Sequence, residues 1–105
     1  MKVVILDSCL KEIKKFPDTA KQSVFELVSD LQAGIQLSMP LSRKMDGMGK
    51  GVFELRVKDV SGVYRVIYIL IKNDAIYMVH GFQKKAQKTP KKNKDLAIKR
   101  IKRLK

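Results

Sequence analysis

The segment Val63–Ile71 (VYRVIYILI) constrains the fold most strongly, because apolar residues occupy both its odd and its even positions. A strand with this composition is buried on both faces and therefore lies inside a sheet rather than at its edge. The preceding residues 53–58 alternate apolar and polar side chains, and a further strand pattern runs from Ala75 to about Phe82. Asn73-Asp74 predicts a tight hairpin turn between the last two strands, since both residues tolerate positive φ.

Helical patterns lie on both sides of these strands in the sequence. Val3–Leu6 predicts a short strand, after which Asp7 or Ser8 caps the first of two helices. The second helix has apolar residues at helical spacing and ends at Ala33-Gly34, because glycine commonly follows a helix C-terminus. Thr89-Pro90 predicts the start of a last helix, with threonine as its cap and proline at its first position.

Residues 35–50 have no hydrophobic period and contain Pro40, Gly47 and Gly49, so we expect a loop there. A chain of 105 residues suits one core, and we assign residues 1–105 to a single domain. The expected fold is α+β. An N-terminal strand and a two-helix hairpin pack on a small antiparallel sheet, and a basic C-terminal helix follows.

The charge of the chain is unevenly distributed. The net charge is +13; residues 1–50 contain eight Lys/Arg and six Asp/Glu, whereas residues 51–105 contain fifteen and four. The first half is therefore interpreted as scaffold, and the second half carries the positive potential. A surface of this kind suits a polyphosphate ligand, and RNA is the first candidate.

The single cysteine, Cys9, excludes an internal disulfide and fits a reducing compartment. The longest apolar run, Val66–Ile71, is too short to span a membrane, and Val3–Leu6 is too short for a signal peptide. We therefore expect a cytoplasmic protein with no membrane partner.

Arg56 and Arg65 interrupt otherwise apolar strand patterns, where a charge is costly to bury unless it is paired or faces water. Two interpretations remain open. In the first, each arginine pairs with a nearby acid, Glu54 or Asp59, as part of the sheet. In the second, both arginines face a groove and bind a phosphate through their planar donor groups.

Residues 84–105 contain eleven Lys/Arg and a single acid, Asp95. Most of these basic residues suit a solvated face or a surface that binds any polyanion. Lys84 and Lys85 differ, because they leave the last strand near the point where the two arginines would converge if both face a groove.

His80 is the only histidine, and strict alternation places it on the same face as Met78 and Phe82, where a packed and hydrogen-bonded role is the first interpretation. One histidine without a cysteine or carboxylate cluster cannot form a zinc site, so we expect neither a metal nor another cofactor. The chemistry within reach is cleavage of RNA by its own 2′-hydroxyl, with arginines and lysines stabilising charge on the phosphate. A lysine crowded by cations has a lowered pKa and is suited to shuttle a proton.

The motifs GVFELR, YRVIY and HGFQKKAQKTP occur in this order ahead of the C-terminal helix. With this combination the chain resembles the RelE/ParE superfamily over nearly its whole length, in particular the HigB-like, phage-derived toxins of type II toxin–antitoxin modules. The resemblance implies a RelE-like fold and a toxin that enters the ribosomal A site and cuts translated mRNA. It also implies a cognate antitoxin, of the helix-turn-helix, DNA-binding HigA-like type, that holds the toxin inactive.

The resemblance also assigns roles to individual residues. Arg56 of ELR and Arg65 of YR hold and polarise the scissile phosphate, and Lys84 or Lys85 stabilises the transition state or assists the leaving group. His80 is a secondary candidate for a base, and after Lys84 the chain has no Tyr, His or Glu of the kind that some relatives use. Contacts with mRNA and ribosomal RNA are expected for the remaining basic residues Lys58, Lys88, Lys91, Lys92, Lys94, Lys99 and Arg100.

Two alternatives remain. A gyrase-poisoning toxin on the same fold, like the ParE branch, predicts DNA-damage signalling without mRNA cuts. A non-enzymatic nucleic-acid-binding module predicts binding that weakens steeply with salt, and no toxicity.

Overall fold

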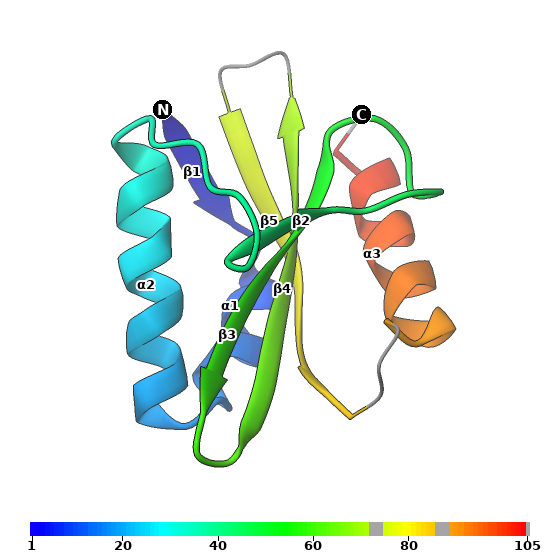
Figure 1. Cartoon of the computed structure of the whole chain (residues 1–105). Helices are drawn as coiled ribbons and strands as arrows, with labels where there is room; N and C mark the ends of the chain where they lie inside the picture. The colour runs from blue at the N-terminus through cyan, green and yellow to red at the C-terminus, as the bar shows by residue number, and fades with distance from the viewer. Residues whose placement is uncertain (72–74, 86–88, 105) are drawn as a thin grey trace.

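A computed structural model describes residues 1–71, 75–85 and 89–104 of the chain. Its sheet has the strand order β1-β5-β4-β3-β2, with three helices packed against it (Figure 1). In chain order the elements are β1 (Lys2–Ile5), α1 (Asp7–Lys14), α2 (Asp18–Gln32), β2 (Ser42–Lys44), β3 (Val52–Asp59), β4 (Gly62–Ile71), β5 (Ala75–Lys84) and α3 (Lys91–Lys102).

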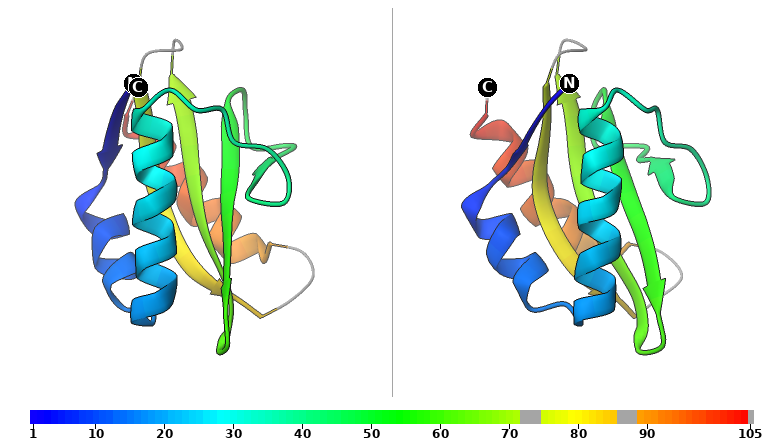
Figure 2. Two further views of the ribbon diagram at one scale, coloured as in Figure 1. Left: turned by 60° about the vertical axis from the view of Figure 1, so that its left-hand side comes forward. Right: turned by 90° about the vertical axis from the view of Figure 1, so that its left-hand side faces the viewer.

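Helices cover both faces of the sheet, with α1 and α2 on one side and α3 on the other (Figures 1 and 2). The central strand β4 supplies side chains to both layers, as its apolar sequence predicts. Val66 and Tyr68 join the core under α1 and α2, whereas Ile67 and Ile69 join the core under α3. No helix in the described ranges is long and apolar enough to cross a membrane.

The predicted α+β fold is confirmed, although the sheet is mixed rather than wholly antiparallel. Strands β2 to β5 are antiparallel neighbours, whereas β1 runs parallel to β5, with Lys2 opposite Ala75 and Ile5 opposite Met78. An apolar tetrapeptide indicates a strand but contains no information on the direction of its partner. The parallel pairing of β1 with β5 is therefore seen only in the structure.

The loop predicted over residues 35–50 contains a short strand, β2, at the edge of the sheet. Ser42–Lys44 pairs with Phe53–Leu55, and the buried Ser42 hydroxyl is 2.7 Å from the Tyr68 hydroxyl. Three polar residues are too few to show an alternating pattern, which explains why the sequence did not reveal this strand. The predicted turn at Asn73-Asp74 lies outside the described residues.

The predicted helix ends are partly correct. Helix α2 ends at Gln32, with Ala33 as its C-cap and Gly34 following at φ 83°, as predicted. At α1, however, Leu6 occupies the cap position, and neither Asp7 nor Ser8 caps the helix. The last helix begins one residue later than predicted, at Lys91. The Thr89 hydroxyl does not cap it and donates a hydrogen bond to Glu54 instead.

A register shift in β5 changes which face His80 occupies. Ile67 pairs with His80 and Tyr68 pairs with Met78, so Val79 is an additional residue, a β-bulge. Because a bulge interrupts the alternation, Met78 packs under α1 and α2 while His80 turns toward α3. The predicted common face of His80 and Met78 is therefore wrong, whereas His80 and Phe82 do stack, with ring centroids 5.2 Å apart.

Gly51 is the glycine with the tightest surroundings, and we expect Gly51→Ala to lower the free energy of unfolding by about 2 kcal/mol. Its φ is +79°, and a Cβ atom there would lie 2.7 Å from the Leu70 carbonyl oxygen. Gly47 has a similar φ of +77° but open space around it, so Gly47→Ala is the matched control, with an expected loss of about 1 kcal/mol. Urea denaturation measures both losses; equal values would show that the contact with Leu70 is unimportant.

Candidate functional site

Strand register brings the predicted cations together on the face of the sheet that α3 covers. Arg56 on β3 is directly opposite Arg65 on β4, and Arg65 is opposite Phe82 on β5. Lys84, two residues beyond Phe82, lies diagonally across from Arg65. Lys85 follows at an exposed position just past the strand. Three strands thus supply one group of positive side chains.

Arg43 on β2 extends this group by one strand, because it is opposite Glu54 in the register. Sequence analysis missed Arg43, since the segment that contains it was interpreted as loop. Recognition of β2 would have been sufficient to find it. We call Arg43, Arg56, Arg65 and Lys84 the cationic cluster.

Arg65 is the buried member of the cationic cluster. It is 2% exposed and forms an ion pair with Glu54, which is fully buried. Burial lowers the pKa of Arg65, and the Glu54 carboxylate opposes this effect. The first of the two interpretations, pairing with a nearby acid, is therefore confirmed for Arg65. Asp59, the other proposed partner, accepts hydrogen bonds from Thr19 and Ser61 instead.

Glu54 has a second partner outside the sheet. Its Oε2 atom accepts a hydrogen bond of 2.7 Å from the hydroxyl of Thr89, two residues before the start of α3. The carboxylate thus connects β3 both to β4 and to the start of the C-terminal helix.

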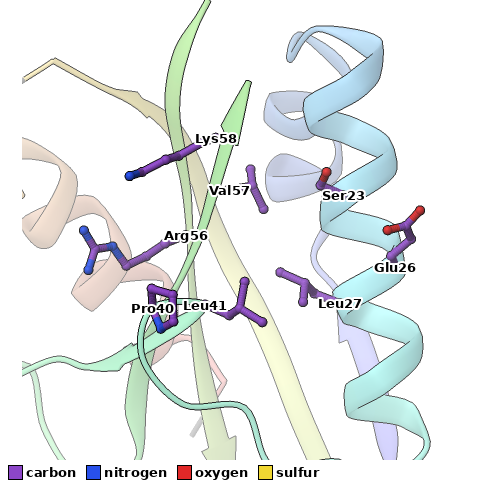
Figure 3. A pocket seen from close by; sticks show the side chains of 8 residues that line it. All are labelled: Ser23, Glu26, Leu27, Pro40, Leu41, Arg56, Val57 and Lys58. Atoms are coloured by element: carbon purple, nitrogen blue, oxygen red, sulfur yellow. The ribbon is translucent and has the colours of Figure 1, made fainter. Parts of the chain in front are cut away.

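Arg56 differs from Arg65 in that no acid in the described part of the chain lies within ion-pair distance of it. Its guanidinium donates a hydrogen bond to the Met39 sulfur at 3.8 Å, and the side chain is half-buried. Figure 3 shows Arg56 and Lys58 on one side of β3 and Val57 on the other, facing Leu27 of α2. Arg56 therefore offers a guanidinium whose charge is not neutralised within the described residues.

Lys84 holds its proton less tightly than an ordinary lysine. Burial lowers the pKa of Lys84, and the Arg65 charge lowers it further. Glu54 acts in the opposite direction, whereas Arg56 and Arg43 again favour the neutral amine. Burial and the neighbouring cations together outweigh Glu54.

A groove of about 390 Å³ lies on the opposite side of β3, between α2 and the segment that leads into β2 (Figure 3). Only Arg56 belongs to both the groove and the cationic cluster. The groove is lined by Ser23, Glu26, Leu27, Pro40, Leu41, Arg56, Val57 and Lys58. The lining combines apolar side chains with one acid, Glu26, and two cations, Arg56 and Lys58.

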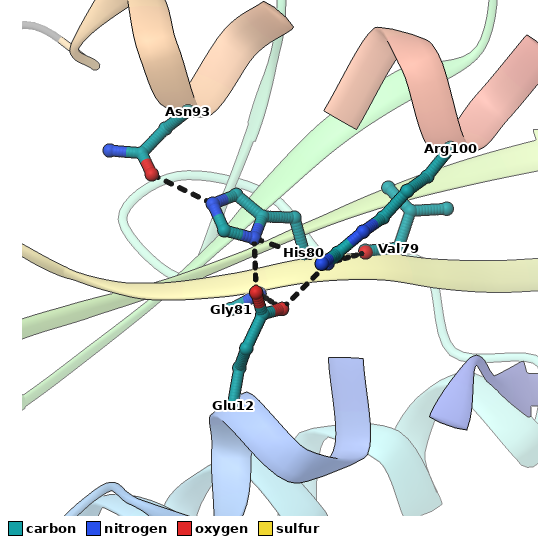
Figure 4. Close-up of polar contacts among 6 residues, drawn as sticks. All are labelled: Glu12, Val79, His80, Gly81, Asn93 and Arg100. Atoms are coloured by element: carbon teal, nitrogen blue, oxygen red, sulfur yellow. Dashed lines mark hydrogen bonds and ion pairs between the residues drawn. The ribbon is translucent and has the colours of Figure 1, made fainter. Parts of the chain in front are cut away.

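His80 lies outside the cationic cluster, in a buried polar network (Figure 4). Its Nδ1 atom is 3.0 Å from Glu12 Oε2, and its Nε2 atom is 2.7 Å from Asn93 Oδ1. The packed, hydrogen-bonded interpretation of His80 is confirmed. Glu12 and Asn93 were not found from sequence, because they are distant from His80 along the chain and belong to different helices.

Arg100 belongs to the same network rather than to the exposed basic face of α3. Its guanidinium donates hydrogen bonds of 2.8 Å to Glu12 Oε1 and to the Val79 carbonyl oxygen. Partial burial by itself would raise the pKa of Glu12, but hydrogen bonds from His80, Arg100 and the Gly81 N–H outweigh it and lower that pKa to about 2.

The other predicted RNA contacts lie mostly in solvent. Lys94 is half-buried, and Lys88 lies outside the described residues. The exposed members are Lys58, Lys91, Lys92 and Lys99. Within the described ranges, no group of three or more His, Cys, Asp or Glu side chains is arranged to hold a metal ion.

A family model for the phage-derived protein Gp49-like matches residues 11–102 of the chain. The chain belongs to the phage-derived Gp49-like family. None of the curated proteins compared with this Gp49-like chain matched it significantly.

The Gp49-like chain has the RelE fold, as its motifs predict. It is similar to a double mutant of the E. coli toxin RelE in the free state, at 17% identity and a TM-score of 0.65 over 99% of this chain and 97% of the other. It is also similar to a chain of the RelB–RelE antitoxin–toxin complex from Methanococcus jannaschii, at 15% identity and a TM-score of 0.62 over 76% and 88%. The RelBE toxin–antitoxin complex from Mycobacterium tuberculosis gives 13% identity and a TM-score of 0.57 over 79% and 96%.

Proposed function

We propose that this Gp49-like protein is the toxin of a RelBE-like toxin–antitoxin system and that it cleaves mRNA on the ribosome. The observation that carries the proposal is the cationic cluster, in which an unneutralised Arg56 and a Lys84 of lowered pKa flank the buried Arg65. The RelE fold and the family support it. Cleavage uses the 2′-hydroxyl of the RNA: its proton passes to solvent water, a bond forms from the 2′-oxygen to phosphorus, and the bond from phosphorus to the 5′-oxygen breaks.

The residues of the site divide this work. Arg56 binds the non-bridging oxygens of the scissile phosphate, where its planar donors neutralise the developing charge. Lys84 gives its proton to the departing 5′-oxygen, which its lowered pKa favours, and the exposed Lys85 adds a second ammonium. Arg65, which is buried and paired with Glu54, contributes positive charge beneath Arg56 and Lys84. His80 is assigned a positioning role, because both of its ring nitrogens are already hydrogen-bonded.

The partners follow from the same proposal. The exposed lysines of α3, Lys91, Lys92 and Lys99, contact ribosomal RNA in the A site, which places the protein in the cytoplasm. A cognate antitoxin, of the helix-turn-helix HigA-like type, binds the toxin and keeps it inactive. The solved RelB–RelE complexes support an antitoxin partner.

Arg56→Ala and Lys84→Ala are expected to lower the rate of mRNA cleavage on translating ribosomes by about 10- to 100-fold each. Each removes a group proposed to act on the phosphate or on the leaving oxygen. Lys14→Ala is the matched control, because it also removes one positive charge, at an exposed position on α1. Cleavage by purified protein and growth arrest on expression are measured together.

Three results would contradict the proposal. Folded Arg56→Ala and Lys84→Ala variants that cut at the wild-type rate would exclude these residues as the site. Growth arrest with DNA-damage signalling and intact mRNA would indicate a gyrase poison. Salt-sensitive RNA binding without growth arrest would indicate a binding module.

A further inference from the structure

We propose that Glu54 is a positioning residue of the candidate site, because one carboxylate holds Arg65 and Thr89 at the same time. The proposal rests on the proposed function and extends it to a residue that does not touch the RNA. It concerns how the cations of the site are held in place and which of them keep a charge that is free to bind phosphate.

Both oxygens of the Glu54 carboxylate are used. Oε1 accepts from Arg65 Nη1 on β4, and Oε2 accepts from the Thr89 hydroxyl at 2.7 Å. With both oxygens occupied in a buried environment, the carboxylate is held in one orientation between Arg65 and Thr89. Three segments, β3, β4 and the residue pair before α3, therefore meet at one side chain.

Because the Thr89 hydroxyl binds Glu54, it does not cap α3. A threonine before proline at the start of a helix is well placed to cap it, yet α3 begins after Pro90 with no side-chain cap. The hydroxyl points to Glu54 instead. The interaction thus holds Thr89 against β3.

Glu54 also separates the cations by function. Its charge neutralises Arg65, the inner member of the cationic cluster, and leaves the outer members Arg43, Arg56 and Lys84 positive. Among these, Lys84 responds directly to Glu54, because the carboxylate raises the pKa of Lys84 against the lowering effects of burial and Arg65. Removal of this carboxylate therefore makes Lys84 lose its proton at lower pH.

Thr89→Val tests the positioning role, because it removes the hydroxyl and keeps the shape of the side chain. We expect the cleavage rate at saturating ribosome concentration to fall about 10-fold, while the half-saturating concentration changes less than about twofold. Thr89→Ser, which restores the hydroxyl, is expected to cleave within about twofold of wild type. A folded Thr89→Val variant with the wild-type rate, or one whose loss Thr89→Ser does not rescue, would overturn the proposal.

Glu54→Gln supplies a readout that does not depend on cleavage. The titration of Lys84, followed by NMR of its side-chain carbon next to the amine, is expected to move to lower pH in the folded Glu54→Gln variant. An unchanged titration would overturn the proposal even if the wild type cuts mRNA. If the wild type does not cut mRNA, the proposed function fails, while the Lys84 titration still decides whether Glu54 controls its surroundings.

Discussion

Replacement of Glu54 by alanine is expected to lower the free energy of unfolding by about 3–5 kcal/mol. Arg65 is 2% exposed, and Glu54 is its ion-pair partner. Without the carboxylate, the guanidinium of Arg65 would remain buried without its ion-pair partner, and the Thr89 hydroxyl would lose its acceptor. Urea denaturation at pH 7 measures the loss, provided that the slope of the transition stays constant.

Two further variants show whether the loss comes from the unpaired charge. Glu26→Ala removes an exposed glutamate from α2 and is expected to change stability by less than about 0.5 kcal/mol. The double variant Glu54→Leu with Arg65→Met removes both charges and is expected to recover most of the loss. If Glu54→Ala loses no more stability than Glu26→Ala, the buried ion pair does not have the energetic role assigned to it.

Acidification is expected to weaken the fold through Glu12 as the pH falls from about 4.5 to about 2. In the folded protein the pKa of Glu12 is about 2, below its ordinary value of 4.5. A carboxylate with a lowered folded-state pKa contributes its full stabilisation above the unfolded value and loses it as the pH falls through the folded value. The shift corresponds to about 3 kcal/mol.

Glu12→Gln is accordingly expected to lose about 3 kcal/mol at pH 7 and to show a flatter dependence of stability on pH below 4.5. The amide cannot bind His80 and Arg100 as a charged acceptor does, so the connection between α1 and α3 weakens. Glu26→Gln makes the same chemical change at an exposed site and keeps the wild-type pH profile. Parallel acid profiles for the wild type and Glu12→Gln would refute this role for Glu12.

The sequence predicted the layers of the fold because burial leaves a periodic trace. Val63–Ile71 has no polar face, and it is the central strand β4, covered on both sides. The direction of β1 was not predictable, since Val3–Leu6 is apolar whichever way its partner runs. Strand β2 was missed because Ser42–Lys44 is too short to show a period.

The candidate site was predictable where its residues lie within regular strands. The sequence identified Arg56 and Arg65 as strand residues, and the register of β3, β4 and β5 brings them together with Lys84. Alternation failed at His80, because the bulge at Val79 has no sequence signal that we recognised. Contacts between distant segments, such as Glu54 with Thr89, leave no periodic trace at all.

The parallel pairing of β1 with β5 also determines when during synthesis the protein is able to fold. Lys2 meets Ala75, more than seventy residues later, and contacts of such long range form late. The cationic cluster likewise needs β5, which supplies Lys84. A nascent chain therefore cannot complete either the sheet or the cluster until β5 has left the exit tunnel. If the protein cleaves mRNA on the ribosome as proposed, a nascent chain has no such activity before β5 has emerged.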